Sequence, residues 1–309
     1  PSMPSAAIGS LHVESCSTRS SFTTGRCRTR SAFSSSSVAS SSFSFSGDDT
    51  SGTGVSGYEC KLDTGAFAAC SSPQSYTGLA DGSHTFAVRA LDGAGNPDAS
   101  PAAYTWVVDT TAPTAAISSA VLGATNSSPI PVTITFDEGV GGFGSLAAAG
   151  DLVVTNGTAS DLVSGSDGDS VYTFTITPAS QGVVTVALDT GSVYDQAGNP
   201  NDAPSNTLSV TYDTVAPSVT VEQAAGQADP AGAAPIEFTV TFDEPVASFT
   251  GANLTLGGSA PGTLSASVSG GPSVYTVALS GMTGSGTVTA ALAAGAVSDP
   301  AGNPNAGSS

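Results

Sequence analysis

The feature that most constrains this chain is a six-residue motif, Asp-x-Ala-Gly-Asn-Pro, which occurs three times. The copies begin at Asp92, Asp195 and Asp299, so the repeating unit is roughly a hundred residues long, the size of one small β-domain. Two other patterns recur at the same interval: Asp-Thr-x-Ala-Pro at 109–113 and 213–217, and Thr-Phe-Asp-Glu at 135–138 and 241–244. The sequence therefore predicts a tandem array of small domains.

Apolar residues alternate with polar ones on a period of two, in short runs separated by Gly, Pro, Asn and Asp. This pattern is typical of strands that bury one face, and frequent turns between short strands indicate an antiparallel β-sandwich. The predicted inward residues of the first domain are Phe43, Phe45, Tyr58, Cys60, Leu62, Phe86, Val88, Ala90, Tyr104, Trp106 and Val108. Those of the second are Val132, Ile134, Phe136, Tyr172, Phe174, Ile176, Val184, Val186 and Leu188. Those of the third are Ile236, Phe238, Val240, Phe242, Tyr275, Val277, Leu279, Val288, Ala290 and Leu292.

Residues 1–35 lack this alternation and are rich in Ser, Thr and Arg. A segment with few apolar residues does not bury enough surface to offset the entropy that folding costs. We expect residues 1–35 to be a disordered or non-native lead-in. The predicted domains after it cover residues 36–110, 111–214 and 215–309.

The chain is strongly acidic, with 25 Asp and Glu against 6 Lys and Arg, and no Lys or Arg follows Ala112. Such a surface repels phosphate backbones and anionic lipids, so we expect no nucleic-acid partner. No apolar run approaches the roughly 18 residues of a membrane span, so we expect no membrane insertion. Carboxylates without nearby cations must be solvated, tolerate repulsion or bind metal ions.

Cys60 and Cys70 flank a predicted hairpin centred on Gly65. This spacing places the two cysteines directly opposite each other across a three-residue loop, in which the glycine can take a positive φ. Opposed strand positions have Cα separations of about 4.5–5.5 Å, which suits a disulfide. We predict a disulfide, which would imply an oxidising, extracytoplasmic compartment; two free buried thiols are the alternative.

Several patterns in these domains are shared with known families. In the first domain they are Tyr58-Glu-Cys-Lys-Leu-Asp63, Cys70-Ser-Ser-Pro73, 76–86 and 103–109, which together resemble a bacterial immunoglobulin-like (Ig-like) repeat of large secreted surface proteins. That resemblance implies paired cysteines and a domain that is one of a string. The second and third domains resemble another bacterial Ig-like family, through 136–138, 151–157 and 195–199 in the second domain and through 242–246 and 252–258 in the third. The implied fold is all-β, with three tandem Ig-like antiparallel β-sandwiches, and the implied role is a helper role in adhesion.

The third domain is expected to lack its C-terminal strand. The second domain closes with an alternating strand at Thr207–Asp213, and the equivalent strand of the third domain would begin beyond Ser309. We expect an unpaired sheet edge there, and we expect the sequence to be part of a longer chain.

No complete catalytic group is apparent in the predicted domains. His84 is their one histidine, and it shares strand parity with apolar residues, which favours a structural role. Asp137-Glu138, repeated as Asp243-Glu244, could suggest the carboxylate pair of a glycosidase, but adjacent strand residues point to opposite faces. We predict that the protein is not an enzyme.

The Asp-x-Ala-Gly-Asn-Pro motif has two interpretations. It can be a turn, in which Gly-Asn permits a left-handed backbone and Asp accepts local amide hydrogen bonds. It can also be half of a Ca²⁺ site, if the last strand is short enough for the motif to meet the linker that follows its domain. The second interpretation predicts metal ligands Asp92, Asn96 and Asp109 at the first junction and Asp195, Asn199 and Asp213 at the second.

These features favour a structural function: a stalk segment of a secreted or cell-surface bacterial adhesin, with Ca²⁺ stiffening its junctions. Two alternatives remain, a carbohydrate-binding or spacer module of a secreted enzyme and a self-assembling extracellular filament or coat subunit. The expected partners are neighbouring Ig-like repeats of the same longer chain, with any glycan or cell-surface ligand bound elsewhere in that chain.

Overall fold

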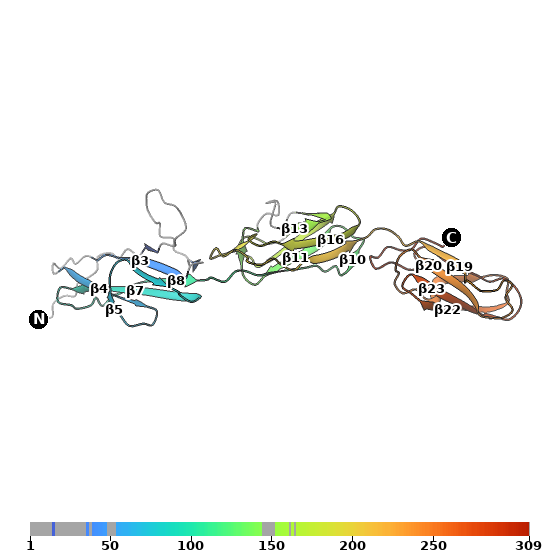
Figure 1. The fold of residues 1–309 in the computed structure, drawn as a ribbon, viewed down its shortest axis with the longest axis horizontal. Coiled ribbons are helices and arrows are strands. Elements are labelled where there is room, and N and C mark those ends of the chain that lie inside the picture. The colour runs from blue at the N-terminus through green and yellow to red at the C-terminus, as the bar shows by residue number, and fades with distance from the viewer. Residues whose placement is uncertain are drawn as a thin grey trace.

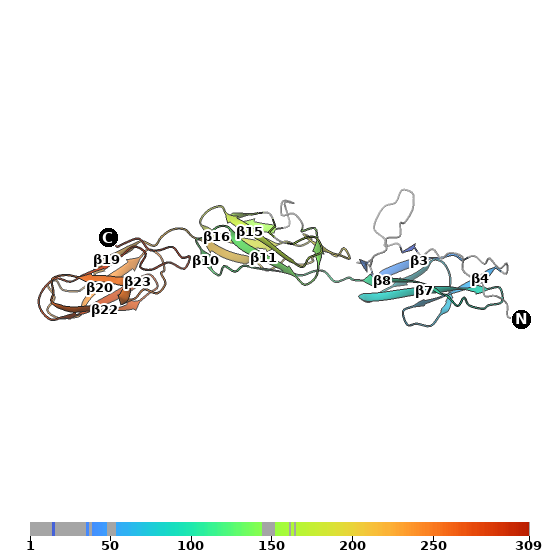
Figure 2. The ribbon, with the colours of Figure 1, turned by 180° about the vertical axis from the view of Figure 1, so that it is seen from behind.

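The computed structural model of the chain describes residues 14–15, 35–36, 39–47, 54–143, 152–160, 162–163 and 165–308. They form three β-sandwiches that lie end to end in an elongated row, which Figure 2 shows from behind (Figures 1 and 2). A single turn of 3-10 helix, η1 (Gly251–Asn253), is the one helical element of these residues. Among them no helix has the length and apolar character needed to cross a membrane.

Domain 1 packs a five-stranded sheet, β2-β8-β7-β4-β5, on a three-stranded sheet, β1-β3-β6. The strands are β1 (Glu14–Ser15), β2 (Ser35–Ser36), β3 (Ser40–Ser44), β4 (Val55–Leu62), β5 (Ala68–Cys70), β6 (Gln74–Thr77), β7 (Gly82–Asp92) and β8 (Ala102–Val108). The core is aromatic: the rings of Phe43 and Phe86 stack with centroids 4.3 Å apart, and Trp106 packs beside them.

Part of the segment that the sequence places outside the fold is paired with domain 1. Glu14–Ser15 pairs with β3, and Ser35 pairs with β8. These residues pair through backbone groups, which need no apolar alternation. The rest of residues 1–35 lies outside the described residues.

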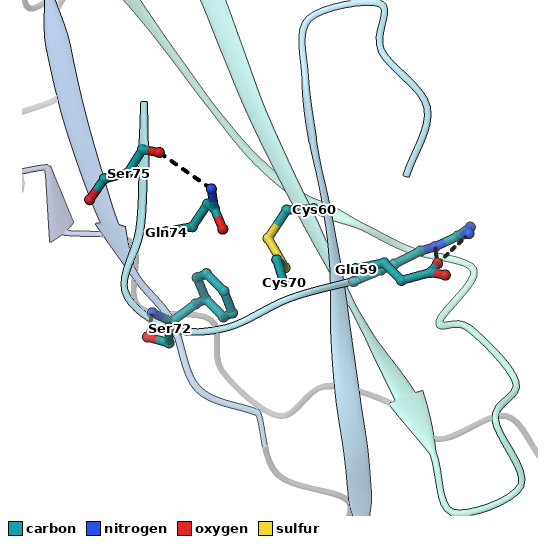
Figure 3. Close-up of a disulfide and its surroundings, with 8 residues drawn as sticks. Glu59, Cys60, Cys70, Ser72, Gln74 and Ser75 are labelled. Atoms are coloured by element: carbon teal, nitrogen blue, oxygen red, sulfur yellow. Dashed lines mark hydrogen bonds and ion pairs between the residues drawn. A yellow bond between two sulfur atoms is a disulfide. The ribbon is translucent and has the colours of Figure 1, made fainter. Parts of the chain in front are cut away.

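The hairpin of β4 and β5 carries the disulfide between Cys60 and Cys70, with a Cα separation of 5.7 Å, so the predicted pairing is confirmed (Figure 3). The predicted register is wrong, because Cys60 lies opposite Ala68 and Cys70 opposite Tyr58. The two cysteines are therefore diagonal neighbours.

The hairpin loop is longer than the sequence predicts, covering residues 63–67. Its positive φ falls at Asp63 (52°), not at Gly65. The Asp63 carboxylate accepts hydrogen bonds from the Thr85 backbone N–H (2.7 Å) and from His84 Nδ1 (2.9 Å), and these bonds hold the left-handed residue in place.

Domain 2 packs the sheet β14-β15-β11-β9 on the sheet β10-β18-β16-β13, with a small β12-β17 pair at one end. Its strands are β9 (Ala115–Ser118), β10 (Ala124–Thr125), β11 (Ile130–Phe136), β12 (Val140–Gly141), β13 (Leu152–Thr155), β14 (Gly157–Ala159), β15 (Val171–Pro178), β16 (Gly182–Leu188), β17 (Tyr194–Asp195) and β18 (Leu208–Tyr212). All nine predicted inward residues are buried in its core, which confirms the alternation.

Domain 3 has the sheet β19-β20-β23-β22 but only a two-stranded second sheet, β21-β24. Its strands are β19 (Val219–Gln223), β20 (Ile236–Phe242), β21 (Leu254–Gly257), β22 (Gly262–Gly270), β23 (Val274–Met282) and β24 (Thr289–Leu292). The Ser308 N–H bonds the Leu292 carbonyl (2.8 Å), just as the Ser205 N–H bonds that of Leu188 in domain 2 (3.0 Å). The chain thus reaches the start of the β18 position, and no strand fills that position among the residues up to 308.

Candidate cation sites at the domain junctions

Each copy of the motif forms the same local turn. In domain 1, Asp92 Oδ1 accepts the backbone N–H groups of Ala94 (2.8 Å) and Asn96 (2.9 Å), and Asp92 Oδ2 accepts Asn96 Nδ2 (2.9 Å). The side-chain hydrogen bond from Asn96 is the main reason that the pKa of Asp92 lies below its usual value. The same aspartate-to-asparagine bonds recur in domains 2 and 3, so all three copies of the motif form this turn.

The structure does not bring Asp92 and Asn96 to Asp109. Gly82, the first residue of β7, pairs with Val108 at the end of β8, and β7 then runs to Asp92. At 3.3 Å per residue, ten residues of strand separate the two ends by about 33 Å. The last strand therefore carries the chain to the end of domain 1 opposite the motif.

In domains 2 and 3 the motif aspartate instead meets the linker that leads into its own domain. Carboxylate oxygens of Asp109, Glu138 and Asp195, which we call the first acidic triad, all lie within 4.8 Å of one another. The second acidic triad, Asp213, Glu244 and Asp299, has the same geometry. Asp195 therefore joins Asp109 rather than Asp213, and the predicted ligand sets are displaced by one domain.

The motif asparagine holds the linker against the motif. Asn199 Nδ2 donates to the backbone carbonyl of Asp109 (2.8 Å) and to Asp195 Oδ2 (2.7 Å). Asn303 Nδ2 does the same with the Asp213 carbonyl (2.9 Å) and Asp299 Oδ2 (2.8 Å). Both asparagines are buried, so they position the triads while their amide nitrogens face acceptors.

The Thr-Phe-Asp-Glu pattern divides its two carboxylates between two tasks. Asp137 accepts the Thr114 backbone N–H (2.8 Å) and hydroxyl (2.7 Å) on the linker, while Glu138 belongs to the triad. Asp243 binds Ser218 in the same way, at 2.8 and 2.7 Å. Sequence reasoning misses Glu138 and Glu244 as triad members, although their repetition at the interval of the motif is a signal that could have found them.

The triads concentrate negative charge in a partly buried place. Burial, and then repulsion from Asp195, Asp109 and Asp137, raise the pKa of Glu138 to about 7. Burial and the charges of Asp213, Asp299 and Asp243 also raise the pKa of Glu244. Since no Lys or Arg follows Ala112, no cationic side chain of domains 2 and 3 offsets this repulsion.

The donor chemistry of a triad fits a hard divalent cation. Ca²⁺ takes about six to eight oxygen ligands, among them carboxylates, backbone carbonyls and water. Three converging carboxylates supply both the oxygen atoms and the charge. A bound cation would also favour the ionised form of Glu138, which burial and its neighbours disfavour.

Tandem antiparallel sandwiches with linker aspartates built into the following domain define a modular Ig-like protein. The model of the bacterial Ig-like domain family matches residues 109–212 and 213–309, so the chain belongs to this family. Both matches begin at the linker aspartate, and each acidic triad therefore lies within one family unit.

Several solved structures are similar to the chain at low identity. Invasin, a bacterial integrin-binding protein, is 14% identical with a TM-score of 0.36, over 84% of this chain and 55% of that chain. The fibronectin(III)-like modules of Clostridium thermocellum CbhA are 19% identical with a TM-score of 0.27, over 59% and 88% of the two chains. SGBP-B of Bacteroides ovatus, solved with a mixed-linkage heptasaccharide, is 16% identical with a TM-score of 0.20, over 96% and 66%. The chain thus spans about half the length of the invasin chain. A search of curated proteins gives no match.

Proposed function

We propose that this chain is a structural spacer, a stalk segment of a secreted or cell-surface adhesin-like protein, and that Ca²⁺ at the two acidic triads stiffens it. The observation that carries this proposal is the repetition of one triad at both junctions. Each triad combines a carboxylate of the linker with two carboxylates of the following domain. The membership in the bacterial Ig-like family and the disulfide support an extracellular or surface location.

The mechanism is electrostatic. Without a cation, the linker aspartate is repelled by the two carboxylates of the domain that it enters, and only hydrogen bonds such as Asn199 to Asp109 hold it there. Ca²⁺ bound to all three carboxylates converts that repulsion into attraction and restricts the hinge. Affinities at about 10⁻⁴–10⁻³ M are typical of extracellular calcium modules, so millimolar calcium would occupy the sites.

The test is small-angle scattering of the full chain in millimolar Ca²⁺ and in chelator, together with thermal melts. We expect Ca²⁺ to narrow the spread of molecular dimensions and to raise the melting temperatures of domains 2 and 3 by mass action. Glu138→Gln should abolish the rise for domain 2, and Glu244→Gln should abolish it for domain 3. Glu222→Gln, an exposed glutamate outside the triads, is the matched control. If Ca²⁺ changes neither the molecular dimensions nor the melting temperatures, the motif forms a turn and the proposed cation sites are wrong.

A further inference from the structure

Domain 2 reaches domain 3 through Asn126, a residue outside every motif. The Asn126 backbone N–H donates to the Ala301 carbonyl (3.1 Å), and Asn126 Nδ2 donates to Asn303 Oδ1 (3.2 Å). Between these two acceptors lies Gly302, whose added Cβ would stand 3.6 Å from Asn126 Nδ2. The motif loop of domain 3 thus presents a carbonyl, a side-chain-free position and an amide oxygen to one asparagine.

Asn126 is held rigidly by the strands beside it. It follows β10, which pairs in parallel with β18, so that Thr125 lies opposite Tyr212. The Asp213 N–H donates to the Thr125 carbonyl (3.0 Å), and the Thr125 side chain is buried and accepts the Ser127 N–H (3.0 Å). Asn126 and the linker residue Asp213 therefore leave domain 2 side by side.

Both polar atoms of the Asn303 side-chain amide bind residues at the outgoing end of domain 2. Its Nδ2 donates to the Asp213 carbonyl (2.9 Å), and its Oδ1 accepts from Asn126. Two hydrogen bonds to one buried side chain fix the orientation of domain 3 relative to domain 2, whereas a single hydrogen bond to the linker would let domain 3 rotate. The orientation of domain 3 on domain 2 is thus specified by polar contacts that need no cation.

The junction between domains 1 and 2 has only one of these attachments. Asn199 Nδ2 binds the Asp109 carbonyl, but among the described residues of domain 1 none donates to Asn199 Oδ1 or to the Ala197 carbonyl. Domain 1 instead holds the linker itself, through Asp81, which accepts Thr110 N (2.9 Å) and the hydroxyls of Thr110 (2.8 Å) and Thr111 (2.9 Å). That contact fixes the linker to domain 1, and Asn199 and Asp137 fix the same linker to domain 2, so the described contacts join the two domains through the linker and not through the motif loop.

We infer that the Ala-Gly-Asn part of the motif is a docking socket for an asparagine at the tip of the preceding repeat, and that Asn126 is the residue that recognises it. The partner surface is therefore the incoming end of another bacterial Ig-like repeat with this motif. The motif loop of domain 2 has the same backbone shape, because φ is 95° at Gly198 and 94° at Gly302 of domain 3. In domain 2 this socket lies next to domain 1, which is a domain of another type.

The outgoing end of domain 3 does not present this donor. The loop of domain 3 that corresponds to residues 119–129 of domain 2 covers residues 224–235 and contains no asparagine. The asparagine thus makes the contact specific to the order of domains: domain 2 docks a like repeat after it, and domain 3 lacks the side chain to do so.

The test is ¹⁵N relaxation of the full chain in chelator, which gives a rotational correlation time for each domain without any contribution from a bound cation. We expect domains 2 and 3 to share one correlation time and domain 1 to differ from them. Asn126→Ala should give domain 3 its own, shorter correlation time. Asn126→Asp should do the same, because it keeps the backbone bond and removes the amide donor.

The matched control is Leu122→Ala, at an 87% exposed position of the same loop that makes no hydrogen bond to domain 3 among the described residues. It should leave the shared correlation time intact, and thermal melts should show domain 2 folded in every variant. A shared correlation time that survives Asn126→Ala, or a domain 3 that already tumbles independently in the unmodified chain, would overturn the inference. Neither result depends on Ca²⁺, so failure here is distinct from failure of the proposed cation sites.

Discussion

Domains 2 and 3 belong to one family and share their motif, their linker and their acidic triad, yet their second sheets differ. Domain 2 completes that sheet with β18, whose Val210 is buried in the core. In domain 3 the sheet has two strands, and Val288 and Ala290 are only half-buried where Val184 and Val186 of domain 2 are fully buried. The triads nevertheless have the same geometry in both domains.

The acidic triad at the junction therefore keeps its geometry although the second sheet of the core changes. The triad is built from the incoming linker, the end of the strand that carries Phe136 and the motif loop, and it contains no residue of β18. The same acidic triad therefore forms with β18 in domain 2 and without a β18 strand among the described residues of domain 3. Each prediction below tests this comparison of domains 2 and 3, starting with the largest expected effect.

The sharpest test completes domain 3. Ser308 matches Ser205, so the sequence of Thr207–Asp213 added directly after Ser309 would continue in register along β24. We expect the melting temperature of domain 3 to rise, because the new strand covers Val288 and Ala290. A gain of at least 1 kcal/mol corresponds to a rise of about 4–8 °C or more in a domain of this size. The same addition with serine at its apolar positions is the control. An equal rise with that control would contradict the role of core burial.

The converse test weakens the contribution of β18 to the core of domain 2. Val210→Ala should destabilise domain 2 by about 2 kcal/mol, through lost apolar burial and a residual cavity, and should leave domain 3 unchanged. Ser209→Ala, on the exposed face of β18, is the matched control. Calorimetric melts that show both domains weakened together would mean that they unfold as one unit, and the comparison would fail.

A third prediction concerns pH. The folded-state pKa of Glu138 is raised to about 7 from 4.5, so its contribution to stability is full below pH 4.5 and is lost as the pH rises to 7. Calcium-free domain 2 should therefore melt at a lower temperature at pH 7.5 than at pH 5, and Glu138→Gln should flatten that change.

The affinity for Ca²⁺ should also depend on pH. Ca²⁺ binding displaces the Glu138 proton, so the affinity for Ca²⁺ should weaken by up to tenfold per pH unit below 7, about 1.4 kcal/mol. Titration calorimetry at several pH values measures this, and a pH-independent affinity would exclude Glu138 as a ligand.

The smallest expected effect compares the linker anchors. Asp137→Ala and Asp243→Ala each remove two hydrogen bonds to the linker and should each cost about 1 kcal/mol. If the incoming ends of the two domains are equivalent, the two costs should agree to within about 0.5 kcal/mol, whatever the state of the closing strand. A larger gap in denaturant titrations would show that the missing strand also weakens the junction.

The alternation of apolar residues predicts the cores well because burial on one face of a strand requires only a period of two. Val132, Ile134 and Phe136 are inward as expected, and the disulfide pair is also right. The hairpin register is not, because Asp63 rather than Gly65 takes the positive φ, held there by the Thr85 backbone N–H and the His84 side chain, both more than twenty residues away in sequence. Local sequence does not encode that contact.

The candidate site shows a different limit. The motif aspartates and the linker aspartates are all identifiable from their repetition, but which of them meet depends on the direction in which the last strand carries the chain. Full-length strands place the motif at the incoming end, so Asp195 meets Asp109. Glu138 is absent from the predicted site because two adjacent carboxylates suggest a pair, whereas strand geometry sends Asp137 to the linker and Glu138 to the triad.

The parallel pairing of β10 with β18 matters for a stalk that is pulled. β10 is joined to the incoming end of domain 2 and β18 to its outgoing end, and both strands run in the same direction. Tension along the row would drag them past each other lengthwise, loading the bonds between them together, including Thr211 N–H to Gly123 (2.8 Å) and Asp213 N–H to Thr125 (3.0 Å). Bonds sheared together resist more force than bonds opened one by one. In the proposed stalk, this shear geometry would make domain 2 a mechanical clamp between its two junctions.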